Sequence, residues 1–369
     1  MMTIEDLALQ FTPRLGVKGV VHLLEVFGDA RSIFAASREE LIRRAELHAA
    51  VADELVRRTG FAAATQELSH CHRHAIRPLC STETEYPSLL REIPDYPHVL
   101  YAQGDPAALS GHLLAVVGTR TASPYGMEQC RRIIAELSER VSDLVIVSGL
   151  AYGIDAMAHR AALEHGLRTV AVVANPLPGV TPVQHTRLAD EILEGGGAIV
   201  TELHSQTKQK GVYFLARNRL IAGLSAGTLL IESPAGGGSL NTASHADAYH
   251  RTLMALPGRP TDRQAQGTNH LIRSHKAQLV TSADDILEEL MWDFGEDPRH
   301  FALPPVTEQL TKDEAGLLGC FRTSDPRSIE ELREVTGMEA GELTALLIGL
   351  ELAGKVRLVP GNRYMKLCD

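Results

Sequence analysis

Residues 113–126 read Leu-Leu-Ala-Val-Val-Gly-Thr-Arg-Thr-Ala-Ser-Pro-Tyr-Gly. The first five residues are apolar, which is typical of a strand that is buried on both of its faces. Gly118 marks a turn after the strand. Pro124 suits the first turn of a helix, where its missing N–H removes no hydrogen bond. The stretch therefore predicts a strand, a turn and a helix, which is the repeating unit of an α/β sheet.

Five further apolar runs follow the same pattern, with helical periodicity between most of them, as in residues 126–141 and 155–165. Buried strands that alternate with helices indicate a mostly parallel sheet covered on both faces. We therefore predict an α/β fold with a Rossmann-like, doubly wound sheet over residues 113–292. Ligands of such sheets bind outside the carboxyl ends of the strands. The five runs are Leu144–Val147, Thr169–Val173, Ala198–Thr201, Thr228–Ile231 and Leu253–Leu256.

Two segments precede the predicted sheet. Residues 1–70 have helical periodicity, with Gly16 and Gly28 placed where helices would end, and they predict a SAM-like or helix-hairpin-helix domain. Its near-neutral charge favours protein packing over phosphate binding. Residues 71–112 are rich in proline and predict an extended lead-in with short strands.

The segment after the predicted sheet consists of a linker and a small domain. Residues 293–309 are expected to form the linker. Residues 310–369 show two helices and a hairpin, the pattern of a winged-helix domain. The start of the second helix, residues 339–344, carries no Lys or Arg that could read a base edge, which favours protein contact over DNA contact.

Composition limits the classes of function. The chain has 369 residues and a net charge of −10, so any nucleic-acid binding must be confined to a local patch. There is no signal-peptide pattern and no apolar run of about 20 residues, so we expect no membrane span and a cytoplasmic protein. The five cysteines are scattered, which indicates reduced thiols. Alternation would place His70, His72 and His74 on one strand face. A polar domain edge explains them better than a metal site.

A local patch of the required kind lies at residues 208–219, Lys-Gln-Lys-Gly-Val-Tyr-Phe-Leu-Ala-Arg-Asn-Arg. It combines four cations and two aromatic rings with no acid, which is the combination that single-stranded nucleic acid requires. Phe214 could instead belong to the core, and Lys208 and Lys210 could be solvated loop charges. One of the two arginines could pair with Glu232 or Asp155.

Glycine-rich loops follow three of the predicted strands. The amides at the start of the helix near Pro124 are expected to attract an anion. Asp155 is expected to cap the helix that follows the second strand. The three glycines at 236–238 form an anion nest that matches neither a nucleotide-triphosphate loop nor a dinucleotide fingerprint. The candidate DNA-binding residues are Gly118, Thr119, Arg120, Ser148, Gly149, Gly153, Lys208, Lys210, Phe214, Arg217, Asn218, Arg219, Gly237, Gly238, Ser239 and Thr242.

Six motifs in this region resemble the DNA-processing protein A family, also called DprA or Smf. In order along residues 113–290 they are Val116-Val-Gly-Thr-Arg120, Ser148-Gly-Leu-Ala-Tyr-Gly-Ile-Asp-Ala-Met-Ala-His159, Phe214-Leu-Ala-Arg-Asn-Arg-Leu-Ile-Ala-Gly-Leu-Ser225, Gly238-Ser-Leu-Asn-Thr242, Leu256-Pro-Gly258 and Gly267-Thr-Asn-His-Leu-Ile272. The chain departs from the family in having Tyr152 where arginine is usual and Leu215 where proline is usual.

The resemblance implies a single-stranded-DNA-binding protein of natural transformation. Such proteins protect incoming strands, form homodimers through the Rossmann-like domain and load the RecA recombinase. No catalytic residue, metal or cofactor is expected. One alternative is a nucleotide-binding enzyme of the phosphoribohydrolase type, but the loop 234–242 lacks the glutamate that would act as acid and base. A second alternative is a scaffold that binds no oligonucleotide.

Overall fold

The computed structural model describes residues 2–292, 312–321, 326–352, 355–359 and 363–366. The chain divides into two compact units, residues 1–295 and 296–369, and each is described here by itself. The predicted linker at 293–309 lies outside the described residues.

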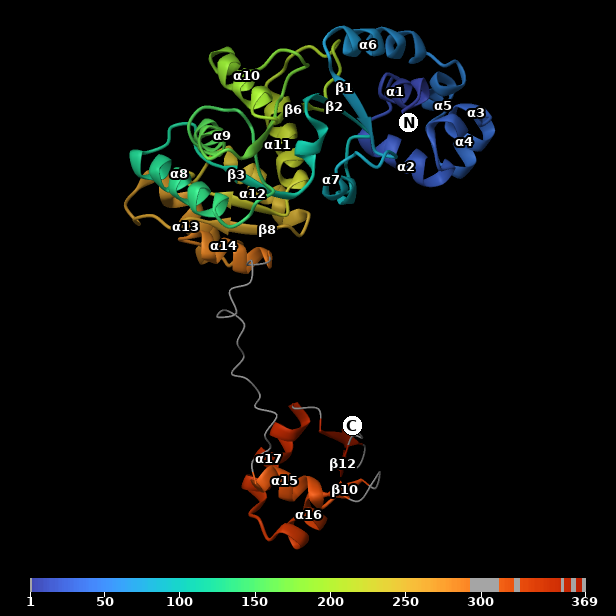
Figure 1. Cartoon of the computed structure of the whole chain (residues 1–369). Helices are drawn as coiled ribbons and strands as arrows, with labels where there is room; N and C mark the ends of the chain where they lie inside the picture. Colours follow the sequence, from blue (N-terminus) through green and yellow to red (C-terminus); the bar gives the residue numbers. More distant parts are fainter. Residues whose placement is uncertain (1, 293–311, 322–325, 353–354, 360–362, 367–369) are drawn as a thin grey trace. The chain divides into compact units, whose positions relative to one another are not determined.

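The larger unit contains a nine-stranded sheet in the order β1-β2-β6-β5-β4-β3-β7-β8-β9 (Figure 1). From β6 to β9 all neighbouring strands are parallel, which confirms the predicted doubly wound sheet. Strands β3 to β8 lie where the apolar runs predicted them, whereas the short strand β9 was not predicted. Their bounds are β3 His112–Val117, β4 Leu144–Ser148, β5 Arg168–Val172, β6 Ala198–Thr201, β7 Gly227–Leu230, β8 Thr252–Ala255 and β9 Gln278–Leu279.

The sheet also takes in the segment before residue 113. Strands β1 (Arg77–Cys80) and β2 (Val99–Gly104) extend it beyond β6, and both pair antiparallel to their neighbours. Between and after them lie α7 (Ser88–Glu92) and the short 3-10 helix η1 (Pro106–Leu109). The proline-rich lead-in is therefore an edge of the sheet.

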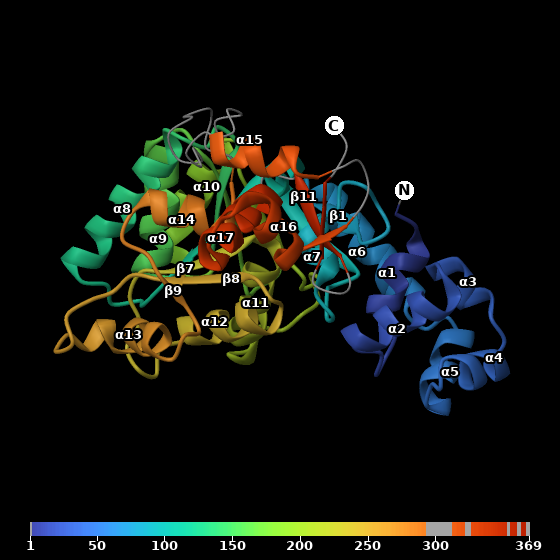
Figure 2. The same ribbon diagram turned by 90° about the horizontal axis from the view of Figure 1, so that it is seen from below.

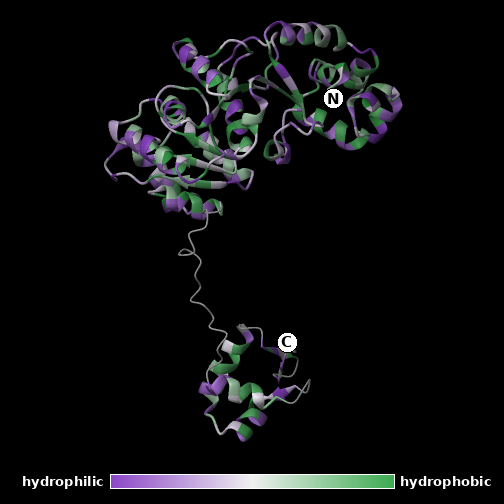
Figure 3. Cartoon of the chain, viewed as in Figure 1, coloured by the Kyte–Doolittle hydropathy of each residue, from purple (hydrophilic) through white to green (hydrophobic). Residues whose placement is uncertain are grey.

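Helices cover both faces of the sheet, as Figures 1 and 2 show. Because side chains alternate along a strand, Leu114 and Val116 join one apolar cluster, whereas Ala115 and Val117 join the other. Green apolar positions are interspersed with purple polar ones along the helices in Figure 3, as expected for helices with one buried side. The covering helices are α8 Pro124–Ser138, α9 Ile154–Glu164, α10 Thr186–Glu194, α11 Val212–Leu224, α12 Ser239–Ala248, α13 Gln266–Arg273 and α14 Ala283–Leu290.

Six helices precede the sheet and pack in the same unit. Gly28 ends α2 as predicted, whereas Gly16 lies at its start as the N-cap residue. The strand expected at His70–His74 is wrong, because His70 and His72 belong to α6 and His74 caps its end. The rings of His70 and His74 lie 4.5 Å apart, as neighbours one helical turn apart do. The helices are α1 Ile4–Gln10, α2 Val17–Phe27, α3 Ala30–Ala35, α4 Arg38–Arg44, α5 Ala49–Val56 and α6 Phe61–Arg73.

The smaller unit has the predicted winged-helix pattern. Its three-stranded antiparallel sheet has the order β10-β12-β11, and Ser328 starts the first of the two predicted helices, α16, with a capping box to Glu331. The second predicted helix, α17, carries no Lys or Arg. Helix α15, which precedes both, was not predicted. The elements are α15 Lys312–Gly319, β10 Arg327–Ser328, α16 Ile329–Thr336, α17 Ala340–Leu352, β11 Val356–Val359 and β12 Arg363–Lys366. Across the described residues of both units, the helices are too short or too polar to cross a bilayer.

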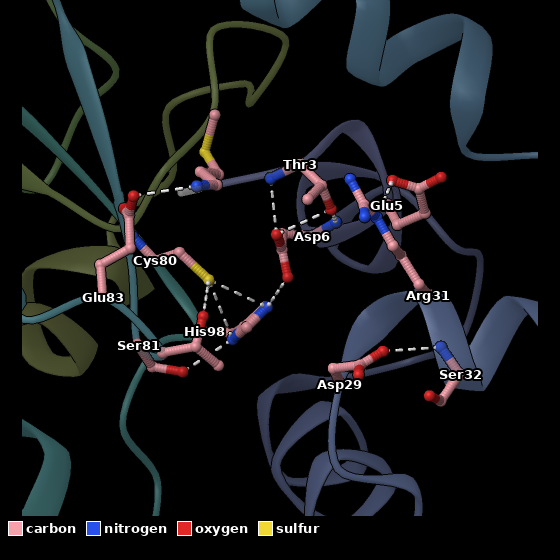
Figure 4. A network of polar contacts seen from close by, with 12 residues as sticks. Thr3, Glu5, Asp6, Asp29, Arg31, Ser32, Cys80, Ser81, Glu83 and His98 are labelled. Atoms are coloured by element: carbon pink, nitrogen blue, oxygen red, sulfur yellow. Dashed lines mark hydrogen bonds and ion pairs between the residues drawn. The ribbon is translucent and has the colours of Figure 1, made fainter.

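A buried polar network joins the first helix to the antiparallel edge of the sheet (Figure 4). His98 Nε2 lies 3.1 Å from Asp6 Oδ1, and His98 Nδ1 lies 2.8 Å from Ser81 Oγ. Burial by itself lowers the pKa of His98, but the hydrogen bonds with Asp6 and Cys80 outweigh it and raise that pKa to about 9. A protonated His98 therefore pairs with an ionised Asp6 at neutral pH.

This ion pair predicts a pH-dependent stability. A histidine whose pKa is raised by folding stabilises the folded state. This stabilisation is complete below the unfolded-state pKa of about 6.5 and is lost as the pH rises to the folded-state pKa of about 9. We expect wild type to exceed His98→Gln by up to roughly 3 kcal/mol in free energy of unfolding at pH 6. The difference should shrink between pH 6.5 and 9 in urea titrations.

His72→Gln provides the control, because His72 is exposed on α6. Its free energy of unfolding should follow wild type across the range. A gap between wild type and His98→Gln that stays constant from pH 6 to pH 10 would contradict the ion pair.

Candidate nucleic-acid interface

A pocket of about 390 Å³ lies where the strand order reverses. From β3 the chain proceeds through β4 and β5 to β6 on one side, whereas β7, β8 and β9 lie on the other. The loops after β3 and β7 therefore diverge and leave a crevice at their carboxyl ends. We call it the switch-point pocket. Its lining residues are Val117, Gly118, Thr119, Arg120, Ala151, Asp155, Phe214, Leu215, Arg217, Asn218, Ile221, Gly237, Gly238, Ser239 and Thr242.

Most of the predicted site residues meet in this pocket. Residues 118–120 come from the loop after β3, and 237–242 come from the loop after β7 and the first turn of α12. Phe214, Arg217, Asn218 and Ile221 all come from α11, with the three-to-four residue spacing of a single helix face.

Arg120 and Phe214 bring a cation and an aromatic ring together in the pocket. The Arg120 guanidinium lies 5.8 Å from the centre of the Phe214 ring, within the range of a cation–π contact. Arg120 is exposed and Phe214 is half-buried. Both side chains can therefore contact a ligand that enters from solvent.

Arg217 lies deeper and is 6% exposed. Its Nη1 donates hydrogen bonds to the carbonyl oxygens of Gly149, at 2.7 Å, and of Val172. Burial lowers the pKa of Arg217 to about 10, so the side chain stays charged at neutral pH. Its Nε is buried and has no partner among the described residues. Arg217 lines the pocket, and its positive charge favours an anionic ligand there.

Asp155 is the one acid among the described residues that line the pocket. It does not cap α9, because Gly153 occupies the N-cap position. Asp155 lies in the first turn instead, and its Oδ2 accepts a hydrogen bond from the Ala151 N–H at 3.4 Å. Burial raises the pKa of Asp155, and the nearby charge of Arg217 opposes that rise.

The glycine-rich loop opens α12 without a side-chain cap, since its N-cap residue is Gly238. A Cβ at Gly238 would meet no atom within 4 Å, so the loop faces open space there. Asn218 Nδ2 braces this loop through the Gly238 carbonyl at 3.4 Å and Asn241 Oδ1 at 3.3 Å. The start of α12 is thus an uncapped helix N-terminus at the pocket wall, where an anion is favoured.

The start of α8, by contrast, is not available to an anion. Glu232, from the end of β7, places its carboxylate there and accepts hydrogen bonds from the Ser123 N–H at 2.9 Å and the Ser123 hydroxyl at 2.5 Å. The expectation of an open anion site at this helix was therefore wrong. Glu232 also does not pair with Arg217 or Arg219.

Three predicted residues support the loops without lining the pocket. Ser148 is fully buried and donates to the Val116 carbonyl at 2.7 Å. A Cβ on Gly149 would overlap the Arg217 guanidinium, so only glycine leaves that side chain its place. Gly153 has φ +76° and packs against the Thr119 carbonyl.

The structure also separates Arg219, Lys208 and Lys210 from the pocket. Arg219 is 8% exposed and pairs with the Glu202 carboxylate, and its Nη1 donates to the Asp95 carbonyl at 2.7 Å. Lys208 and Lys210 are exposed in the segment before α11. Residues 208–219 therefore supply the pocket only through the face of α11 that bears Phe214 and Arg217.

One group of metal-ligand types comes together among the described residues, Asp6, Cys80 and His98, with ligand atoms within 4.8 Å of one another. It lies in the buried network of the first helix, away from the switch-point pocket. Its polar atoms already bond to one another and to Ser81, so hydrogen bonding accounts for the cluster.

Comparison with known proteins gives consistent matches. Residues 77–291 match the family described as DNA recombination-mediator protein A, and residues 301–362 match the DprA winged helix domain. The chain is 36% identical to Protein Smf of Escherichia coli over 285 residues, which covers 76% of this chain and 75% of the relative. It is 40% identical to DNA processing protein DprA of Streptococcus pneumoniae over 205 residues, which covers 55% of this chain and 71% of the relative.

Two solved structures are also similar. The X-ray structure of DNA processing protein A from Streptococcus pneumoniae has a TM-score of 0.68 and 31% identity, covering 78% of this chain and 98% of that one. The second is a structure of DNA processing protein A from Helicobacter pylori, reported for its single-stranded DNA binding mode. It has a TM-score of 0.53 and 29% identity, and the match covers 59% of this chain and 97% of that one.

The Glu232 contact predicts a specific loss of stability. In Glu232→Gln the amide keeps one acceptor, but the charge at the start of α8 is lost and an N–H₂ group faces a donor. We expect the free energy of unfolding to fall by about 1–3 kcal/mol in urea titrations. Glu128→Gln, on α8, removes only an exposed contact with Arg131. Its free energy of unfolding should therefore differ from that of wild type by less than about 0.5 kcal/mol. Equal stabilities of the two variants would refute the capping role.

Proposed function

The chain belongs to the DNA recombination-mediator protein A family, and on this basis we propose that it binds single-stranded DNA in the switch-point pocket. The observation that carries the proposal is a single pocket lined by two guanidinium groups, those of Arg120 and of the buried Arg217, beside the ring of Phe214. The similar Helicobacter pylori protein binds single-stranded DNA. Cations and stackable rings are the two elements that such binding requires.

The phosphate contacts are assigned to two groups that line the pocket. Arg120 is exposed after β3 and offers a fork of N–H donors. The uncapped start of α12 offers backbone amides and the positive end of the helix dipole. Arg217 adds charge from below, where its position is fixed by the carbonyls of Gly149 and Val172.

Phe214 is assigned to base stacking. The Arg120 guanidinium lies over this ring, so a base that stacks on the ring would displace the guanidinium, which could then contact the adjoining phosphate. Stacking on an aromatic side chain contributes roughly 1–3 kcal/mol per base and tolerates any sequence, because every base has a flat face. Binding at this pocket is therefore expected to depend weakly on sequence.

The pocket favours binding over hydrolysis. A hydrolase of the nucleotide type needs a carboxylate that reaches the substrate. Among the described lining residues the one acid is Asp155, which is buried beside Arg217 and accepts a backbone N–H. Its position suits the support of Arg217 and not proton transfer to a ligand.

Two substitutions should separate the charge and stacking contributions. Arg120→Ala removes one phosphate contact, so the slope of log affinity against log salt should fall by ~0.7. Phe214→Leu keeps an apolar side chain but loses the ring. Its affinity should fall by about fivefold or more, the equivalent of ~1 kcal/mol, with an unchanged slope. Fluorescence anisotropy of a labelled single-stranded oligonucleotide across a salt series measures both.

Arg131→Ala is the matched control for charge, since Arg131 lies on the outer part of α8 and pairs with Glu128. It should bind like wild type. Wild-type affinity in both Arg120→Ala and Phe214→Leu would reject this placement of the DNA. A wild-type protein that binds no oligonucleotide would favour the scaffold alternative.

The finer role rests on the family resemblance. We propose that the protein acts as a homodimer that protects the bound strand and delivers it to the RecA recombinase during transformation. If so, adding the protein should raise DNA-dependent ATP hydrolysis by RecA on single strands coated with a single-strand-binding protein. The Arg120→Ala variant should raise ATP hydrolysis by RecA less than the wild-type protein does. Sedimentation equilibrium of the wild-type protein should give the mass of a dimer. Unchanged ATP hydrolysis with the wild-type protein would contradict the recombinase role but not DNA binding.

A further inference from the structure

A second pocket, of about 850 Å³, lies at the same edge of the sheet. One wall is the start of α8, with Pro124 and Tyr125. The other is the segment 257–264, which follows β8 and leads toward α13. We call it the β8 pocket. Like the switch-point pocket, it lies beyond the carboxyl ends of parallel strands, one strand further along the sheet.

The two pockets share the loop between β3 and α8. Residues 118–120 of this loop line the switch-point pocket, and Ser123 lines the β8 pocket. Gln264 Nε2 binds the middle of the loop through the Thr121 carbonyl at 2.9 Å and the Thr121 hydroxyl at 3.0 Å. The two pockets are therefore neighbours across this loop.

The β8 pocket repeats the chemistry of the first. Tyr125 is 53% exposed in the first turn of α8 and offers a free ring. Arg259 and Arg263 are exposed on the opposite wall, and neither has an ion-pair partner among the described residues.

Two acids moderate the charge of this pocket. The Glu232 carboxylate is occupied by Ser123. Asp262 is exposed between the two arginines in sequence and offsets part of their charge. The pocket is therefore suited to one phosphate and one stacked base better than to a dense run of phosphates.

We propose that the β8 pocket is a second subsite for the same single DNA strand, in which Tyr125 stacks a base and Arg259 and Arg263 contact the adjoining phosphate. The proposal rests on the proposed function, because the strand is first anchored in the switch-point pocket. The second subsite lengthens the footprint of the DNA along the sheet edge.

An oligonucleotide length series tests the second subsite. A short strand that fills only the switch-point pocket should bind equally to wild type, to Tyr125→Leu and to the double variant Arg259→Ala/Arg263→Ala. A longer strand should bind wild type more tightly than the short one. Both variants should bind the longer strand at least about fivefold more weakly than wild type does. In the double variant the slope of log affinity against log salt should also fall by ~0.7.

Two controls make the outcome specific. Arg131→Ala, on the same helix as Tyr125, should bind long strands like wild type, and circular dichroism should show that every variant is folded. The subsite is refuted if both variants bind the long strand like wild type, or if Arg131→Ala loses as much affinity as they do. Sensitivity to Arg120→Ala at every length would then still support the first pocket, so the two proposals fail separately.

Discussion

The pocket depends on one buried cation, Arg217. Its guanidinium donates to carbonyls that follow β4 and end β5, so it ties α11 to the carboxyl edge of the sheet. An unpaired charge at that depth is strongly unfavourable, and the fold compensates with carbonyl acceptors and with Asp155 nearby. Arg217 also lines the switch-point pocket, so the pocket has a buried positive charge in its wall.

The neighbouring loops are arranged around this cation without blocking it. Gly149 leaves space for the guanidinium, because a Cβ there would clash with it. Glu232, another carboxylate of the strand ends, is held by Ser123 at the start of α8 and so does not neutralise Arg217. The result is a crevice with a positive character in a chain whose net charge is −10.

Much of the architecture could be predicted from local patterns. Apolar runs such as residues 113–117 can be satisfied only inside a covered sheet, and each was found in a strand. The prediction was less accurate where the pattern was short or polar. The His70–His74 run has the alternation of a strand, but it lies at the end of a long helix whose buried residues decide its conformation. The antiparallel edge formed by β1 and β2 was also missed as part of the sheet, because strand pairing is a long-range contact.

The sequence by itself determined the family, the parallel sheet and the residue types of the site, since these follow from periodicity and from motifs with few alternatives. Only the tertiary structure decided which of the two arginines faces the pocket. Once residues 212–224 form a helix, Phe214 and Arg217 share a face, whereas Arg219 is turned by about 200° from Arg217 and meets Glu202. Residues adjacent in sequence were thus separated by the helical rotation, and residues distant in sequence were brought together by the reversal of strand order between β3 and β7.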